Sequence, residues 1–345
     1  MFEYYAIITG SDREVIREFS LKLDYLFTRG CFSGIIMAGR VLPRAFQVFP
    51  QSVSNRYSRE KDMKTIAVVN YKGGVGKTVF SICIAQALAL TGSRVLVIDN
   101  DAQHNLSMVL GENVYRPSIR EVYHQNVGNA GVVLMQSIRE TALRNLHIIT
   151  SCAELANVDV RDTGILQKAI NYASLSRFYD YVIIDNSPGF DLLQETAVIA
   201  ADELFVPTEL SFFAINGIRE MLGLIERKLG GDLRPVRIIP NFYRGTKRQD
   251  QYLEQLRTLY PKMITETNIP FDSIFEECVK EKKTLFVNHL YSKAAAFYLK
   301  LVEELFDVRE EHCWEQALSK RREHISNGAR VRYFEQRVAK AEGVA

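Results

Sequence analysis

The chain has 345 residues, of which 47% are hydrophobic and 24% charged, and its formal net charge is +2 at pH 7. These proportions are those of an ordinary globular protein and exclude a low-complexity or intrinsically disordered chain. The small net charge does not by itself indicate a nucleic-acid partner, so DNA binding would need a local basic patch. The five cysteines are scattered without a CxxC pair, which indicates neither disulfides nor zinc. No signal peptide or bilayer-length apolar run is apparent, so we expect a cytoplasmic protein.

Residues 1–62 precede the part of the chain that contains recognisable motifs. Tyr4–Thr9 and Phe32–Met37 are predicted strands and Asp12–Phe27 a predicted amphipathic helix, which together give a small βαβ-like unit. A unit of this size is too short to be stable alone. The polar stretch Gln51–Asp62 is a predicted connector. Because no catalytic constellation occurs here, we expect these residues to have a packing or partner-docking role. The alternative is that the working protein starts at Met63 and that this segment is not part of it.

From Lys64 onward, short runs rich in Val and Ile alternate with segments of helical periodicity. This alternation predicts an α/β fold, a doubly wound and mainly parallel sheet with helices on both faces. Ligands of such sheets bind at the carboxyl ends of the strands. We expect this domain to cover residues 63–308 and residues 309–345 to form a charged helical tail. The predicted strands are 64–70, 94–98, 146–150, 180–185, 203–207 and 235–240.

A glycine-rich run, KGGVGKT at Lys72–Thr78, lies between the first of these strands and a helical segment. A strand, a glycine loop and a helix in this order are the context of a phosphate-binding loop. The glycines allow successive N–H groups to turn toward an anion, and the helix dipole strengthens the attraction. The pattern places Lys77 on the β- and γ-phosphates and the Thr78 hydroxyl on Mg²⁺. A chance glycine turn is the alternative, and the complete motif argues against it.

Acidic residues follow two later predicted strands. Asp99 and Asp101 come after the run that ends at Ile98, and Asp185 ends the hydrophobic run Tyr181–Ile184. An apolar strand that ends in aspartate is the second acidic motif of P-loop enzymes, so we expect Asp185 to hold Mg²⁺ through water. An acid after a strand can also simply cap the next helix. The upstream phosphate loop favours the functional interpretation.

The glycine loop departs from the common pattern GxxxxGK[ST], because Tyr71 stands in place of its first glycine and Lys72 follows. It resembles the deviant form xKGGxGK[ST] of the ParA/MinD family of dimerising ATPases. The resemblance implies that Lys72 crosses an ATP-bound dimer to the partner subunit's phosphates and acts in catalysis with Lys77. It also implies a nucleotide site formed by Gly73, Gly74, Val75, Gly76, Lys77, Thr78 and Val79.

The resemblance spans residues 64–306. Asp99–Ser107 is similar to the DxDPQxNxS segment of the family with Ala102 in place of proline, which implies that Asp101 orients the attacking water and that Asp99 helps to organise Mg²⁺. Asn186–Gly189 resembles the DxPPG loop that senses the γ-phosphate. Asn241 and Pro270 match positions near the adenine. The Asn241 amide can read a base edge because it has both a donor and an acceptor, and a turn asparagine is an equal alternative.

The partners that we expect also come from this resemblance. It implies ATP and Mg²⁺ as cofactors, an ATP-dependent homodimer, non-specific DNA binding on the nucleoid, and a ParB-like or cargo-adaptor protein that stimulates hydrolysis. Such a protein segregates or positions plasmid, chromosome or other cargo. Basic clusters that could contact phosphates are Arg244, Lys247 and Arg248, then Lys280, Lys282 and Lys283, then residues 320–322. Charge runs on exposed helices are often only solvated, which is the alternative for each cluster.

The deviant loop also occurs in nitrogenase-like reductases, arsenite-pump ATPases and MinD-type membrane oscillators. The reductases bridge an iron–sulfur cluster with two cysteines per subunit, whereas here Cys152 has no counterpart after Asp185. MinD proteins end in a basic amphipathic membrane helix. Residues 330–337 mix charges among few large apolar residues, so membrane binding is not expected. A MinD-like positioning ATPase and a non-segregating regulatory ATPase of the superfamily are the alternatives.

Overall fold

The computed structural model describes residues 63–111, 116–231, 233–280, 284–290 and 292–306, together with three short strands nearer the N-terminus. The chain divides into two compact units, Met1–Glu60 and Lys61–Ala345. In the first unit, β1 (Ile7–Ile8) pairs in parallel with β2 (Ile36–Met37), which pairs antiparallel with β3 (Arg40–Val41). The predicted helix at 12–27, the connector at 51–62 and the tail at 309–345 lie outside the described residues.

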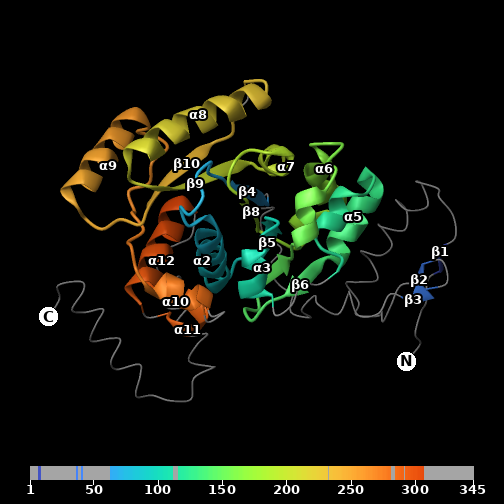
Figure 1. The fold of residues 1–345 in the computed structure, drawn as a ribbon. Coiled ribbons are helices and arrows are strands. Elements are labelled where there is room, and N and C mark those ends of the chain that lie inside the picture. The colour runs from blue at the N-terminus through green and yellow to red at the C-terminus, as the bar shows by residue number, and fades with distance from the viewer. Residues whose placement is uncertain are drawn as a thin grey trace, which may run out of the picture. The chain divides into compact units, whose positions relative to one another are not determined.

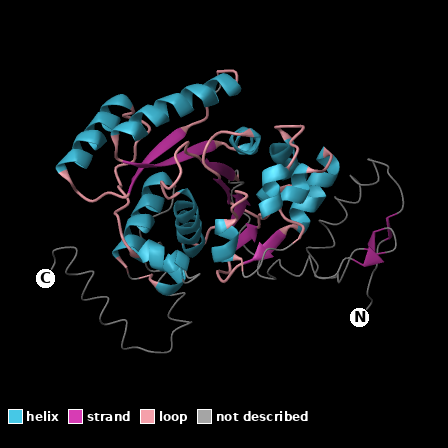
Figure 2. Ribbon diagram, viewed as in Figure 1, coloured by secondary structure: helices cyan, strands magenta, loops and turns pink. Residues whose placement is uncertain are grey.

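The second unit is built on a seven-stranded sheet in the order β10-β9-β4-β8-β5-β7-β6, with helices on both faces (Figures 1 and 2). Every neighbouring pair is parallel except β6 and β7. The predicted doubly wound α/β fold is therefore confirmed. The strands are β4 (Lys64–Val68), β5 (Val95–Asn100), β6 (Ile138–Glu140), β7 (Leu146–Ile149), β8 (Tyr181–Asn186), β9 (Glu203–Glu209) and β10 (Val236–Asn241).

The sheet separates two hydrophobic cores, and helices cover the core on each face (Figure 1). One core lies under α2 (Lys77–Leu90), α3 (Asn105–Leu110), α10 (Ile274–Lys280), α11 (Leu285–Asn288) and α12 (Lys293–Leu305). The other lies under α4 (Ile119–Tyr123), α5 (Val127–Gln136), α6 (Ile165–Tyr172), α7 (Leu192–Ala200), α8 (Phe212–Lys228) and α9 (Lys247–Leu259). Short 3₁₀ turns occur at Ala153–Asn157 and Leu175–Arg177.

The central strands are apolar on both sides because each side faces one of these cores. In β8, Ile183 contributes to the core under α2, and Val182 and Ile184 contribute to the opposite core. Successive side chains of a strand point to opposite faces, so a strand buried on both faces is a nearly continuous apolar run. In β5 and β8 the polar pairs Asp99–Asn100 and Asp185–Asn186 lie at the carboxyl ends, which form one edge of the sheet.

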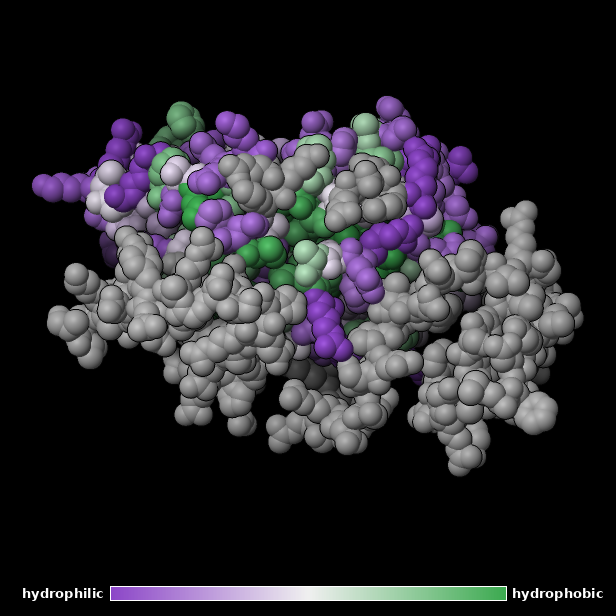
Figure 3. All heavy atoms as spheres, turned by 90° about the horizontal axis from the view of Figure 1, so that it is seen from below, coloured by the Kyte–Doolittle hydropathy of each residue, from purple (hydrophilic) through white to green (hydrophobic). Residues whose placement is uncertain are grey.

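The described surface includes both hydrophilic and hydrophobic side chains, as Figure 3 shows for one face. Within the described residues, no helix combines the length and the apolar character that crossing a bilayer requires.

Candidate functional site

The phosphate loop joins β4 to α2 at the carboxyl edge of the sheet. Gly74 and Gly76 have φ angles of 73° and 85°, which lie in the left-handed region that side chains rarely adopt. A Cβ atom at Gly76 would lie 2.7 Å from the Asn241 amide nitrogen, so this position has no room for a side chain. Because α2 begins directly after Gly76, its first N–H groups face the space above the loop, where an anion binds favourably.

Lys77 is folded back over this loop. Its ammonium donates hydrogen bonds to the carbonyl oxygens of Asn70 and Lys72, each at 3.2 Å, and the residue is buried. Burial lowers the pKa of Lys77, and the negative charges of Asp185 and Asp101 act in the opposite direction. The loop thus holds the desolvated ammonium of Lys77 close to two carboxylates. A phosphate group can bind to this ammonium, and a metal ion bound to the phosphate can be held by the carboxylates.

Asp99 and Asp185 occupy paired register positions at the ends of β5 and β8, and both are fully buried. Asp185 accepts a hydrogen bond of 2.7 Å from the Ser81 hydroxyl, while its Oδ2 has no partner among the described residues. Burial, together with the neighbouring Asp99, raises the pKa of Asp185 to about 7. Two carboxylates so close together and so desolvated cannot both be charged at low cost without a cation.

The carboxylates of Asp99 and Asp185 differ in how many of their oxygens already accept hydrogen bonds. Asp99 Oδ2 accepts hydrogen bonds from the backbone N–H of Ser107 at 2.8 Å and from its hydroxyl at 2.6 Å, and Oδ1 accepts the N–H of Asp101 at 3.2 Å. Burial also raises the pKa of Asp99 to about 7. Asp99 therefore holds the following segment in place through both oxygens, whereas Asp185 retains a free oxygen for another ligand.

The residues at this edge fit a magnesium ion that is completed by phosphate and water. The unpartnered Asp185 Oδ2 is a hard oxygen ligand, and the Thr78 hydroxyl interacts with the same carboxylate. Among the described residues, no group of three His, Cys, Asp or Glu side chains could hold a metal ion by itself. Mg²⁺ commonly binds through one or two protein oxygens together with substrate phosphates rather than in an all-protein cage.

Asp101 lies one turn before α3 and is buried. Its Oδ1 accepts the N–H of Gln103 at 2.9 Å, and its carbonyl accepts the N–H of His104 at 2.9 Å. These two bonds close a local turn ahead of α3. The negative charge of Asp101 acts to raise the pKa of Lys77, so the two side chains lie near each other.

Lys72 differs from Lys77 in that 46% of its side chain is exposed. Its ammonium forms an ion pair with Glu209 at the end of β9, and Glu209 also accepts a hydrogen bond of 3.1 Å from the Ser211 hydroxyl. The two lysines of the glycine loop therefore have different surroundings: Lys77 is enclosed by the loop, and Lys72 lies at the surface.

Asn241 supports the glycine loop from the end of β10. Its amide nitrogen donates to the Val75 carbonyl at 2.9 Å, and its Oδ1 accepts the N–H of Phe242 at 3.0 Å. Both ends of the amide are thus used within the protein, and recognition of a base by Asn241 stays a prediction. Pro270 lies beside it in a bridge to Tyr243 and lines a cavity of about 550 Å³.

Comparison with known proteins supports the resemblance to the ParA/MinD family. Residues 63–230 match a family described as an AAA domain. The chromosome partitioning protein ParA of Caulobacter vibrioides is 31% identical over 70% of this chain and 94% of its own length. The chain belongs to the ParA family. The sporulation initiation inhibitor protein Soj of Bacillus subtilis is 28% identical over 70% of this chain and 98% of its own length.

The fold of this ParA family member is also similar to a solved structure. The septum site-determining protein MinD of Pyrococcus horikoshii, complexed with Mg-ADP, has a TM-score of 0.59 and 26% identity, and covers 70% of this chain and 96% of its own. The predicted membership of the ParA/MinD family is thus confirmed by both sequence and fold.

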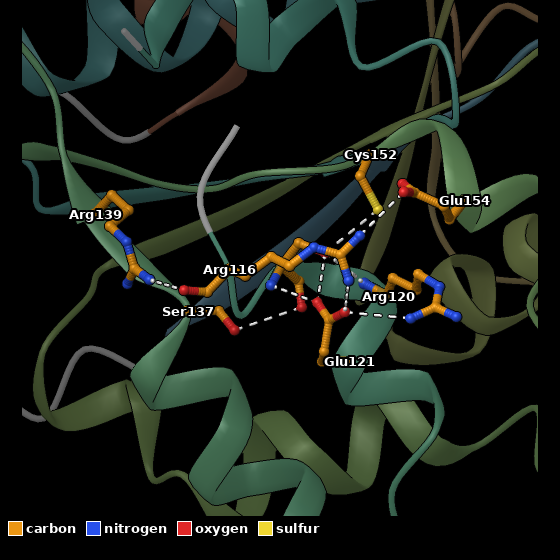
Figure 4. Close-up of polar contacts among 8 residues, drawn as sticks. Arg116, Arg120, Glu121, Ser137, Arg139, Cys152 and Glu154 are labelled. Atoms are coloured by element: carbon orange, nitrogen blue, oxygen red, sulfur yellow. Dashed lines mark hydrogen bonds and ion pairs between the residues drawn. The ribbon is translucent and has the colours of Figure 1, made fainter. Parts of the chain in front are cut away.

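Cys152 belongs to a different group of contacts in this ParA family member, at the end of β7 (Figure 4). Its thiol lies 3.7 Å from the Ser118 hydroxyl and is buried, and burial raises its pKa. Arg116 bonds Glu121 at 3.1 Å and Glu154 at 3.0 Å beside it, as Figure 4 shows. A neutral, enclosed thiol is typical of a structural cysteine rather than a cluster ligand.

Several site residues were not predicted from the sequence. Ser81 and Ser107 hold the two strand-end aspartates, and Glu209 pairs with Lys72. Ser107 is the last residue of the DxDPQxNxS-like segment but was given no role there, and Ser81 lies four residues after Lys77 on the following helix, a spacing that could have indicated it. Glu209 carries no local pattern, because its partner is 137 residues away in the sequence.

Proposed function

We propose that this protein is a Mg²⁺-dependent ATPase that forms an ATP-dependent dimer, binds DNA without sequence preference, and segregates or positions DNA or another cargo. A ParB-like or adaptor protein would stimulate hydrolysis. The observation that supports this best is the phosphate loop with a buried Lys77 above it and the free oxygen of Asp185 beside it. Membership of the ParA family supports the cellular role.

Each residue of the site has a distinct task in this proposal. The loop N–H groups and Lys77 bind the phosphates, and Thr78 and Asp185 hold Mg²⁺, with Asp99 fixing the segment that follows. Mg²⁺ would neutralise charge on the β- and γ-phosphates. Asp101 orients water for attack on the γ-phosphate. Because phosphoryl transfer depends mainly on positioning and charge neutralisation, one carboxylate can supply this function, and slow intrinsic turnover is expected.

The dimer would form where Lys72 is exposed. At the start of α8, close in sequence to its partner Glu209, Phe212 and Phe213 are 55% and 78% exposed and stack edge to face at 5.7 Å. Exposed aromatic pairs are a common component of protein interfaces. Facing phosphate loops would bury this pair and exchange the Glu209 contact of Lys72 for the partner subunit's phosphates. The charge of the γ-phosphate would thus control assembly.

DNA binding would use the basic surface beyond β10. Arg244, Lys247 and Arg248 are exposed, and the Arg244 guanidinium lies 3.4 Å from the centre of the Phe271 ring. Lys293 and Lys300 of α12 line the same cavity as Arg244 and extend this surface. Lys280 is exposed on α10, and Lys282, Lys283 and residues 320–322 lie outside the described residues. Phosphate contacts of this kind would give an affinity that falls steeply with salt.

The first test replaces Lys72 with alanine and measures the sedimentation of the full chain with ATP, with ADP and without nucleotide. The wild-type protein should dimerise only with ATP, and the Lys72→Ala variant should stay monomeric while it still binds ATP. Lys228→Ala is the matched control, since Lys228 is 45% exposed and also paired with a glutamate. Equal dimerisation of wild type and Lys72→Ala would refute the cross-subunit contact.

The second test separates catalysis from binding. Asp101→Ala should bind ATP and dimerise but lose most hydrolysis, because only the water loses its orientation. Asp159→Ala, at an exposed ion pair with Arg161, controls for the loss of a carboxylate. If Asp101→Ala retains wild-type hydrolysis, Asp101 has another role. Retention on non-specific duplex DNA at low salt, reduced in Arg244→Ala, tests the DNA surface.

A further inference from the structure

We propose that Asn100 and Asn186 form a buried positioning pair that couples the phosphate-sensing loop to Asp101. The inference depends on the proposed ATPase function and adds to it the residues that set hydrolysis. The two side chains lie opposite each other at the ends of β5 and β8, one position beyond the Asp99 and Asp185 pair. The Asn100 amide donates to Asn186 Oδ1 at 2.9 Å.

The pair is enclosed and its amide groups are well satisfied. Asn100 and Asn186 are 0% and 1% exposed. Asn100 also donates to the Leu193 carbonyl at 3.1 Å, and Asn186 donates to the carbonyls of Val68 and Ile184, each at 3.1 Å. Both donor hydrogens of each amide thus have an acceptor, as buried polar groups require.

The hydroxyl groups of Tyr123 in α4 and Thr196 in α7 extend the hydrogen-bond network of the pair. The Tyr123 hydroxyl donates to Asn100 Oδ1 at 2.7 Å and lies 3.0 Å from the Thr196 hydroxyl. The Thr196 hydroxyl in turn lies 2.6 Å from the Leu193 carbonyl. The network therefore connects the ends of β5 and β8 with the first turn of α7.

The pair lies on the face of the sheet opposite to α2, the helix that follows the phosphate loop, so we assign its action to the segments that it joins and not to contact with substrate. Asp185 bonds Ser81 of α2, whereas Asn100 and Asn186 face α4 and α7, where the preceding side chains on that face, Ile98 and Ile184, are apolar. An apolar pair would need no hydrogen-bond partners of its own, but it would leave the Leu193 and Val68 carbonyls and the Tyr123 hydroxyl without these bonds. Buried polar networks of this type instead fix one specific arrangement of the segments that they join.

The segments joined here are the two that would respond to ATP. Asn186 is followed by Ser187–Gly189, whose Gly189 N–H donates to the Tyr71 carbonyl of the glycine loop at 3.2 Å. Asn100 is followed directly by Asp101. A shift of the loop at 187–189 on γ-phosphate binding therefore moves Asn186 and the start of α7, and the shared amides transmit this movement to Asp101.

Isosteric leucine variants test the coupling. Asn100→Leu and Asn186→Leu each leave an unpaired amide in the core, so each should lower the Tm and slow hydrolysis. In the double variant no unpaired amide remains between the two positions, and its Tm should recover toward that of the wild type. If the pair positions Asp101, the double variant should still hydrolyse saturating ATP about tenfold to a hundredfold more slowly, with the Kd for ATP unchanged.

Ser137→Ala is the control for the loss of a buried hydrogen bond, because the Ser137 hydroxyl donates to the Val133 carbonyl at 2.7 Å outside this network. It should shift the Tm and leave the hydrolysis rate unchanged. A double leucine variant that regains both the Tm and the wild-type rate would show a purely structural pair and overturn the inference. Absence of ATP hydrolysis in the wild-type protein would instead refute the proposed function, and the coupling with it.

Discussion

The raised pKa of the buried Asp185 carboxyl leads to a quantitative prediction about the stability of the protein in the absence of nucleotide and Mg²⁺. Burial raises the folded-state pKa of Asp185 from 3.8 to about 7, so the folded protein keeps a proton that the unfolded chain releases. Stability is therefore highest below the unfolded pKa and falls as pH rises toward the folded pKa. The shift corresponds to about 4 kcal/mol in total, of which about 3 kcal/mol is lost between about pH 5 and about pH 8.

The assay is urea denaturation of the full chain in EDTA at these two pH values, for wild type and Asp185→Asn. The variant should lose about 3 kcal/mol less over this interval, because its amide does not titrate. The comparison uses the change with pH, so a constant cost of burying the amide cancels. Asp159→Asn, at an exposed ion pair, should leave the pH dependence unchanged. Identical pH dependence in wild type and Asp185→Asn would refute a protonated, buried Asp185.

Three further predictions concern the loop and the dimer face. Gly76→Ala should cost about 2 kcal/mol of stability and weaken ATP binding, since it combines a left-handed φ with a close contact, whereas Gly74→Ala, with open space around its Cβ, should cost less in denaturation and ATP titration. Glu209→Gln should strengthen ATP-dependent dimerisation by up to about fivefold in sedimentation, because it frees Lys72; weaker dimerisation would place Glu209 in the interface. Phe213→Ser should weaken the dimer about tenfold in the same assay. The control is Leu259→Ser at the C-terminal end of α9, which should leave dimerisation unchanged.

The sequence was sufficient to predict the fold because its strands are buried on both faces. Continuous apolar runs and a glycine loop mark such strands without knowledge of distant contacts. The end of β5 was predicted at residue 98, whereas the strand continues to Asn100 because its polar end still pairs with β8. The antiparallel β6 (Ile138–Glu140) was not predicted, since three partly exposed residues carry no periodic pattern.

The candidate site was predictable only where the chemistry is local in the sequence. Residues 72–78 and the aspartates at strand ends occur in short motifs with a physical meaning at fixed spacing. The pairing of Lys72 with Glu209, and of Asn100 with Asn186, joins residues 137 and 86 positions apart. These contacts depend on the strand order of the sheet, which the spacing of residues along the chain does not determine.

The packing of α2 also has a consequence for synthesis of the protein. Phe80, three residues after Lys77, is fully buried and lies 6.0 Å from the ring of Tyr298 in α12. On the ribosome, the whole glycine loop is synthesised long before residues 293–305. The helix that begins at the loop therefore lacks its covering partner until residues 293–305 have been translated, so the capacity to bind nucleotide matures only after that segment is made.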